Sequence, residues 1–295
     1  MQNLNIQRSF FLGDEWLYYK IYCGVKIADQ LLACDLKPLT EELVQNSIIK
    51  EWFFIRYDEN GLHLRVRFLL SAPESLLFVA QKMNAILKPY INEDLVWKVQ
   101  NDTYQREIER YGSNTMELSE TLFYHDSNMI VSMLDLIEGD EGEVCRWHFA
   151  LRAVDAITED FAYSIDDKIR LYTRLKEGYG KTFGYDNARF ALVNDKYRKE
   201  KNTIEKLMNK ADDAEKEIQP LLALIDEKSY FSRAAVDEIL VMWESGRLEM
   251  ETDNLLSSYT HMLNNRLFRS KQNAHEVVIY AFLQKYWQSM KARNK

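Results

Sequence analysis

The sequence predicts an α+β fold, in which the first third mixes strands and helices around an antiparallel sheet and the remainder is helix-rich. Two apolar-rich runs flank Asp-Glu-Asn-Gly at 58–61, and Asn-Gly between such runs is a strong β-hairpin signal. From residue 119 onward the apolar residues recur with helical spacing. Without a repeat or a convincing linker, residues 1–295 are expected to form a single domain, which can be subdivided into an α/β lobe, 1–117, and a mainly helical lobe, 118–295.

The first third is expected to alternate strands and helices. Aromatic and β-branched residues favour strands, whereas apolar residues three and four positions apart indicate helix. Because proline disrupts a helix interior, Pro38 is expected to end the first helix. The expected elements are a strand at 15–22, a helix at 25–36, the hairpin at 52–69, a helix at 71–88 and a strand at 95–99.

Composition excludes several function classes. The formal net charge is -8, which argues against direct nucleic-acid binding because that needs a net basic face. Three cysteines without a close pair form neither a disulfide framework nor a zinc ribbon, so we expect no metal and no cofactor. No signal peptide is visible, and no apolar run approaches the roughly 20 residues of a membrane span. The expected location is the cytoplasm.

The second run of the hairpin alternates apolar and basic residues. Side chains on a strand point to opposite faces in turn, so His63, Arg65 and Arg67 are predicted to share one face. If the loop holds an even number of residues, Arg56 joins them. Like charges on one face destabilise a sheet, so the face either binds an anionic partner or pairs with acidic residues elsewhere in the fold. Spacing alone leaves both interpretations open.

Two later segments carry polar residues with helical spacing. As a helix, residues 102–112 would align Asp102, Arg106 and Arg110, and periodicity alone favours a solvated ion ladder. His261 and Asn265 fall on one side of the helix predicted at 254–268. On spacing alone, a hydrogen-bonded structural histidine is the favoured interpretation.

Together these segments resemble the C-terminal elimination domain of class I lanthipeptide dehydratases, also called the thiopeptide-type bacteriocin biosynthesis domain. The resemblance covers nearly the whole chain, and its motifs occur in the family's order. One departure is Ser113, where the family usually has a second glycine. The motifs are Trp16-x-Tyr18-x-Lys20-x-Tyr22-Cys23-Gly24, the runs 52–57 and 62–68, Tyr104-x-Arg106-Glu107-Ile108-x-Arg110-Tyr111-Gly112, Glu120-x-x-Phe123-x-x-Asp126-Ser127, and His261-Met262-x-x-Asn265-Arg266-Leu267.

The resemblance implies an enzyme, a lyase that removes glutamate from glutamylated Ser or Thr residues of a precursor peptide. The product would be dehydroalanine or dehydrobutyrine. Arg65, Arg67, Arg106 and His261 match the family's catalytic residues. The histidine would transfer the proton, and the arginines would stabilise carboxylate and enolate charge. The expected substrate-binding residues are His63, Arg56, Tyr104 and Asn265.

The resemblance also implies partners, because the family's glutamylation domain is not found in this sequence. The chain is expected to act as the stand-alone half of a split dehydratase, beside a separate glutamylation protein that uses glutamyl-tRNA. Two alternatives stay open. One is a thiopeptide pyridine synthase, which joins two dehydroalanines in a formal cycloaddition and expels the leader peptide. The other is a non-catalytic protein that binds a leader peptide or acts as a scaffold.

Overall fold

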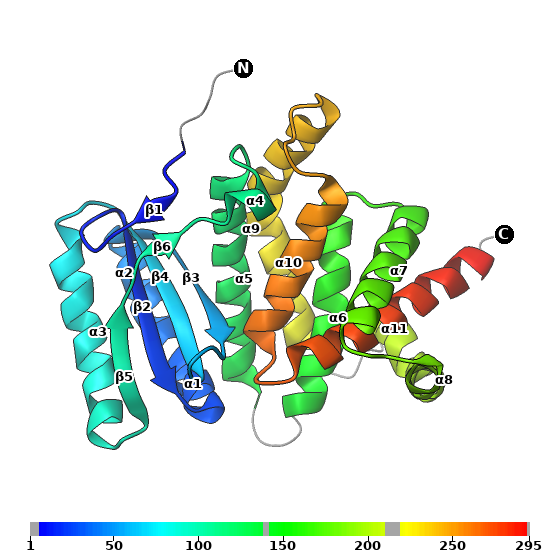
Figure 1. The fold of residues 1–295 in the computed structure, drawn as a ribbon, viewed down its shortest axis with the longest axis horizontal. Helices are drawn as coiled ribbons and strands as arrows, with labels where there is room; N and C mark the ends of the chain where they lie inside the picture. Colours follow the sequence, from blue (N-terminus) through cyan, green and yellow to red (C-terminus); the bar gives the residue numbers. More distant parts are fainter. Residues whose placement is uncertain (1–5, 138–141, 210–218, 294–295) are drawn as a thin grey trace. The chain divides into compact units, whose positions relative to one another are not determined.

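The computed structural model forms two compact units. The first contains residues 1–136 and 237–250, and the second contains residues 137–236 and 251–295. The expected α+β class is confirmed, because a small antiparallel sheet lies near the N-terminus and the rest is mainly helical (Figure 1). The single-domain organisation, with its subdivision at 117/118, stays a prediction. The structure describes residues 6–137, 142–209 and 219–293.

The first unit is built on a four-stranded antiparallel sheet with the strand order β3-β4-β2-β5. The predicted hairpin is confirmed, and its turn places Asn60 and Gly61 at φ 59° and 109°, in the left-handed region that Asn and Gly tolerate best. Two further short strands, β1 and β6, pair with each other. The strands are β1 (Ser9–Phe10), β2 (Trp16–Cys23), β3 (Ile49–Tyr57), β4 (His63–Leu70), β5 (Val96–Asn101) and β6 (Tyr104–Gln105).

Helices α1 (Val25–Gln30), η1 (Leu31–Leu36) and α2 (Lys37–Gln45) follow one another without a break. The expectation that Pro38 ends the helix is therefore wrong. The wider π-helical turn of η1 lies directly before Pro38, and such turns change the hydrogen-bond register that proline would otherwise interrupt. The later helices of this unit are α3 (Ser75–Asn92), α4 (Ile108–Tyr111) and α5 (Met116–Leu136).

The apolar face of the sheet forms the core of the first unit. Leu64, Val66 and Phe68 of β4 are almost completely buried, and α2 and α3 pack against the strands β3 and β5. Helix α5 covers β3, where the Phe54 amide donates to Ser127 Oγ at 3.2 Å and Trp52 Nε1 donates to Asn128 at 2.9 Å. The contact with Ser127 satisfies a backbone amide that an uncovered edge strand would leave without a hydrogen-bond partner.

The second unit is helical. Its last helix is buried on nearly every side between Val277 and Leu283, as expected for a helix at the centre of a bundle, and it packs against α6, α7, α8 and α10. The division between the units falls within α9. The helices are α6 (Gly142–Asp160), α7 (Ile165–Thr182), α8 (Asn187–Met208), α9 (Gln219–Glu244), α10 (Thr252–Leu267) and α11 (Gln272–Arg293).

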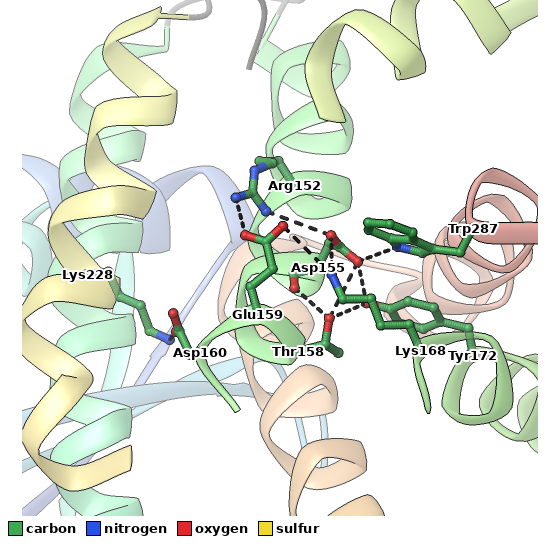
Figure 2. Close-up of polar contacts among 9 residues, drawn as sticks. All are labelled: Arg152, Asp155, Thr158, Glu159, Asp160, Lys168, Tyr172, Lys228 and Trp287. Atoms are coloured by element: carbon green, nitrogen blue, oxygen red, sulfur yellow. Dashed lines mark hydrogen bonds and ion pairs between the residues drawn. The ribbon is translucent and has the colours of Figure 1, made fainter. Parts of the chain in front are cut away.

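A buried carboxylate joins three of these helices (Figure 2). Asp155 of α6 accepts from Lys168 at 3.0 Å and from Tyr172 at 2.9 Å, both on α7. Trp287 of α11 donates its indole N–H to the same carboxylate at 2.7 Å. A buried carboxylate must be hydrogen-bonded and paired to be tolerated, and Asp155 meets both requirements. We interpret this cluster as structural.

The described part of the chain contains no helix with the length and apolar character needed to cross a membrane.

Candidate active site

The basic residues of β4 lie on the sheet face opposite the apolar core. In the register of the sheet, His63 pairs with Tyr22, Arg65 with Lys20 and Arg67 with Tyr18. Directly opposed residues of antiparallel strands point to the same side. The prediction that His63, Arg65 and Arg67 share one face is therefore confirmed, and we call this surface the basic face. Its β2 members are Tyr18, Lys20 and Tyr22, and its β3 members are Phe53, Ile55 and Tyr57.

The placement of Arg56 on the basic face is wrong. Arg56 pairs with Leu64, on the apolar side of the sheet, because the loop 58–62 has an odd number of residues. Its guanidinium binds Asp29 of α1 at 2.5 Å. Arg56 therefore connects a helix to the sheet. The substrate-binding role expected for Arg56 stays a prediction.

Arg67 is buried in an aromatic cage. The guanidinium carbon lies 4.4 Å from the ring centre of Tyr18, 4.8 Å from that of Tyr104 and 5.1 Å from that of Phe53. Its side chain has no hydrogen-bond or ion-pair partner among the described residues, and its Nε is fully enclosed. Burial lowers the pKa of Arg67, whereas burial raises the pKa of Tyr18 and Tyr104. The cage therefore offers cation–π contacts but no carboxylate in contact with the guanidinium.

Arg65 is held by two neighbours on the same face. Its guanidinium carbon stacks 3.4 Å from the centre of the Tyr57 ring, and its Nε donates to His63 Nε2 at 3.1 Å. The other nitrogen of His63, Nδ1, lies 2.8 Å from the Gly61 carbonyl oxygen. A neutral imidazole protonated at Nδ1 satisfies both contacts. His63 thus orients Arg65, while Glu59 is the nearest acid at 3.8 Å and is largely exposed.

Two lysines extend the basic face beyond His63, Arg65 and Arg67. Lys20 lies opposite Arg65 and also opposite Gln100, and it forms an ion pair with Asp102. Lys98 is exposed, lies opposite Tyr22 and places its ammonium 5.0 Å from the centre of that ring. Side chains alternate between the two faces of β2 and β5. Once these strands are paired in one sheet with β4, this alternation assigns both lysines to the basic face.

Arg106 is not part of an exposed ladder. The segment 102–107 is not helical, and Arg106 follows strand β6 with its side chain buried. Its guanidinium forms a bidentate pair with Glu120 of α5, with Nε to Oε1 at 2.8 Å and Nη2 to Oε2 at 2.6 Å. Tyr104 donates to the same carboxylate at 2.6 Å. Burial alone would lower the pKa of Arg106, but its hydrogen bonds to Glu120 raise it.

Tyr104 connects the two arginines, because its ring contacts Arg67 and its hydroxyl binds Glu120. Arg67, Tyr104 and Arg106 therefore lie together in the first unit. Arg110, the other arginine of this segment, is about half exposed and contacts Glu107 at 3.2 Å. Chemically, the basic face offers one buried guanidinium and one oriented guanidinium to an anion.

His261 lies on α10 in the second unit. Its Nδ1 is 2.9 Å from the Tyr179 hydroxyl, 3.1 Å from both carboxylate oxygens of Glu276 and 3.2 Å from Gln272 Nε2. The imidazole is partly exposed, whereas Glu276 is completely buried. The convergence of His261 with Arg65, Arg67 and Arg106 around one cleft stays a prediction.

Sequence reasoning did not identify Glu276 as the acidic partner of His261. Glu276 precedes the apolar run 277–283, and an acidic residue next to a fully buried helix segment is an unusual pattern that could have drawn attention to it. Asn265 donates to Gln272 Oε1 at 3.0 Å, so Asn265 orients the glutamine beside His261. Its expected role in substrate binding stays a prediction. Among the described residues no three His, Cys, Asp or Glu side chains form a group that could hold a metal ion.

The fold is similar to solved structures of dehydratases and related enzymes. The tRNA-dependent lantibiotic dehydratase MibB from Microbispora sp. 107891 superimposes with a TM-score of 0.70 at 20% identity, over 97% of this chain and 29% of that chain. TsrL gives a TM-score of 0.69 at 15% identity, over 94% of this chain and 95% of its own. The pyridine synthase TbtD from thiomuracin biosynthesis gives 0.66 at 13%, over 94% of this chain and 100% of its own. At these identities the likeness concerns the fold.

Sequence comparison identifies the family. The subtilin biosynthesis protein SpaB of Bacillus subtilis is 26% identical over 183 residues, 61% of this chain and 18% of that protein. The nisin biosynthesis protein NisB of Lactococcus lactis subsp. lactis is 32% identical over 126 residues, 42% of this chain and 12% of that protein. The chain thus matches less than a fifth of either relative. Residues 16–287 match the sequence model of the lantibiotic biosynthesis dehydratase C-terminal family, and the chain belongs to that family.

Proposed function

We propose that this chain eliminates glutamate from glutamylated Ser or Thr residues of a ribosomally made precursor peptide, leaving dehydroalanine or dehydrobutyrine. The observation that carries the proposal is Arg67, a buried guanidinium in an aromatic cage with no carboxylate partner among the described residues. A buried charge without a counter-charge is costly. An anionic substrate group would supply the missing partner. Membership of the dehydratase family and the biosynthetic relatives support the same assignment.

The elimination needs two kinds of protein group. A base removes the Cα proton of the glutamylated residue, the Cβ–O bond breaks, and glutamate leaves as a carboxylate. The α proton of a peptide residue is a weak acid, so the developing enolate needs electrostatic stabilisation. We assign proton transfer to His261. We assign binding of the carboxylates and the enolate to Arg65 and Arg67, because guanidinium forks bind carboxylates in a bidentate manner.

The structure changes the role that we propose for Arg106. Its Nε and Nη2 are already occupied by Glu120 and its Nη1 by the Gln7 carbonyl, so we propose that it supports the aromatic cage through Tyr104 as a positioning residue. Arg110 keeps more of its donors accessible, since its recorded contact is with the exposed Glu107. Comparing Arg106→Met with Arg110→Met separates loss of the cage from loss of a surface cation.

Glutamylation of the peptide is proposed to come from a separate protein that uses glutamyl-tRNA. Residues 16–287 match the C-terminal family of the lantibiotic dehydratases, and in this proposal the partner supplies the ester that this chain consumes. The substrate class is therefore a peptide with a glutamyl ester on Ser or Thr, and the chain itself has no need to contact the tRNA.

The direct test is a synthetic peptide that carries one glutamyl ester on serine. We expect the wild-type protein to release glutamate and to leave a peptide with dehydroalanine, both measured by mass spectrometry. Arg67→Met and His261→Ala should retain the ester. The matched control is Arg198→Met on α8, because Arg198 is exposed and contacts the nearby Asp195; its release rate should equal that of the wild type.

Three outcomes would overturn the proposal. Wild-type release no faster than that of Arg67→Met would show that the basic face does not serve this reaction. Inactivity on the ester combined with cyclisation of a peptide containing two dehydroalanines would identify a pyridine synthase. If both peptides remain unchanged while an unmodified leader peptide binds, the protein is a scaffold.

A further inference from the structure

The contacts of His261 distinguish its two ring nitrogens. The four polar contacts described above all reach Nδ1, from Tyr179 on α7 and from Gln272 and Glu276 on α11. Among the described residues Nε2 has no such contact. The ring is partly exposed, so one nitrogen faces a fixed polar cluster while the other is available to a reactant.

Glu276 is held rigidly beside Nδ1. The carboxylate is completely buried and accepts hydrogen bonds from Tyr280 Oη at 2.9 Å and from Gln272 Nε2 at 3.2 Å. The same amide nitrogen of Gln272 lies 3.0 Å from the His261 carbonyl oxygen, which fixes the glutamine. Burial raises the pKa of Tyr280 well above its usual value, so its hydroxyl remains a donor. Among the described residues, His261 is the only group recorded in an ion pair with Glu276.

This arrangement decides where the ring proton resides. An Nδ1 lone pair directed at two carboxylate oxygens 3.1 Å away would be repelled, whereas an Nδ1–H group is attracted by them and is a natural donor to them. A neutral imidazole has only one N–H, so a proton on Nδ1 leaves the lone pair on Nε2. Among the described residues, the titratable groups in contact with Nδ1 are Glu276 from α11 and Tyr179 from α7, and Tyr280 of α11 donates to Glu276.

We infer that Glu276 is a positioning residue that keeps His261 protonated at Nδ1 and leaves Nε2 as the proton acceptor. The inference rests on the proposed function for the donor of that proton, the Cα of the glutamylated residue. When Nε2 takes the proton, the ring becomes a cation beside a carboxylate already held by Tyr280 and Gln272. The carboxylate stabilises that cation without reorganising, and it does not itself become protonated.

The first measurement is the tautomer of His261 in the intact protein, by ¹⁵N chemical shifts of labelled histidine at a pH where the ring is neutral. The signal is assigned by its loss in His261→Gln, since the sequence holds five histidines. We expect the shifts of a ring protonated at Nδ1. A ring protonated at Nε2 in the wild type would overturn the inference. This chemical-shift measurement requires no substrate.

The second measurement uses Glu276→Gln, which keeps the size of the side chain and removes its charge. An amide can either donate to Nδ1 or accept from it, so the Nδ1–H preference should be lost. Elimination from the synthetic ester should fall by about 10²–10⁴-fold, and the acid limb of its pH–rate profile should move to lower pH. Glu276→Asp should restore part of the rate. Glu177→Gln makes the same change at an exposed position of α7 and should alter neither the tautomer of His261 nor the elimination rate.

The two measurements separate this inference from the proposed function. An unchanged tautomer in folded Glu276→Gln overturns the role of Glu276. A changed tautomer with an unchanged elimination rate upholds that role and removes His261 from the proposed mechanism. If Glu276→Gln fails to fold, Tyr280→Phe keeps the carboxylate and removes only one of its donors. That variant should keep the Nδ1–H tautomer, and loss of this tautomer would count against the inference.

Discussion

Arg67 and Arg106 occupy similar depths in the first unit but have opposite surroundings. Only 7% of Arg67 and 3% of Arg106 is exposed. Arg106 has a bidentate carboxylate, Glu120, and a backbone carbonyl, that of Gln7 at 3.1 Å. Arg67 has aromatic rings, and among the described residues no acid forms a hydrogen bond or ion pair with it. A buried charge whose partner is built into the fold holds the fold together, whereas a buried charge without one points to an external partner.

The same contrast occurs between two carboxylates of the second unit. Asp155 is paired with Lys168 and hydrogen-bonded by Tyr172 and Trp287 (Figure 2), and its cationic partner is buried with it. Glu276 faces His261, a partly exposed imidazole that is charged only when it is protonated. The first carboxylate is neutralised permanently, while the second is placed to respond to a proton on its partner.

The largest expected effect is loss of stability in Arg106→Met. Removing one partner of a buried pair leaves the other charge uncompensated, which typically costs about 3–5 kcal/mol. We expect the free energy of unfolding, measured by urea denaturation, to fall by about that amount. Arg106→Met combined with Glu120→Gln should recover much of the loss, because no buried charge is then left alone. An Arg106→Met protein as stable as the wild type would show that the pair of Arg106 and Glu120 does not stabilise the fold.

Arg67→Met should show the reverse pattern. Methionine fills part of the cage and removes a charge that has no acidic partner among the described residues, so the free energy of unfolding should be unchanged or higher. Release of glutamate from the synthetic ester should fall by about 10²–10³-fold, as for loss of one donor to a developing negative charge. A variant that loses stability as severely as Arg106→Met, with its rate unchanged, would mean that Arg67 is structural.

Sequence reasoning succeeded where structure is local. The alternation of His63, Arg65 and Arg67 follows from the two-residue period of a strand, and the hairpin follows from Asn60-Gly61. Arg56 was misplaced because its face depends on the number of loop residues, which shifts the register by one.

Longer-range pairings were beyond the sequence pattern. Glu120 joins Arg106 from a different helix, and Glu276 reaches His261 from α11, the helix after α10. Neither spacing corresponds to a strand or helix repeat, so periodicity could not reveal these pairs. The two partners decide whether each charged residue is satisfied within the fold, and for that reason we propose a positioning role for Arg106.

The smallest expected effect is the pH dependence that His63 gives to the basic face. Burial lowers the pKa of His63 below its usual 6.5, and the adjacent Arg65 acts in the same direction, although the hydrogen bond to Gly61 opposes them. The unfolded chain therefore binds more protons than the folded protein between the lowered pKa and about 6.5. The contribution of neutral His63 to stability is fully present above pH 6.5 and is lost as the pH falls through the folded pKa. His63→Gln removes this titration, while His275, whose pKa burial also lowers, remains in both proteins and cancels. Protonation would also abolish the acceptor for Arg65 Nε and release that guanidinium from its orientation.

We expect the free energies of unfolding of wild type and His63→Gln to run parallel from pH 7.5 to 8.5 and the wild type to lose stability relative to the variant from about pH 6.5 down to 5. Parallel curves over the whole range would show that His63 does not act as the neutral support of Arg65.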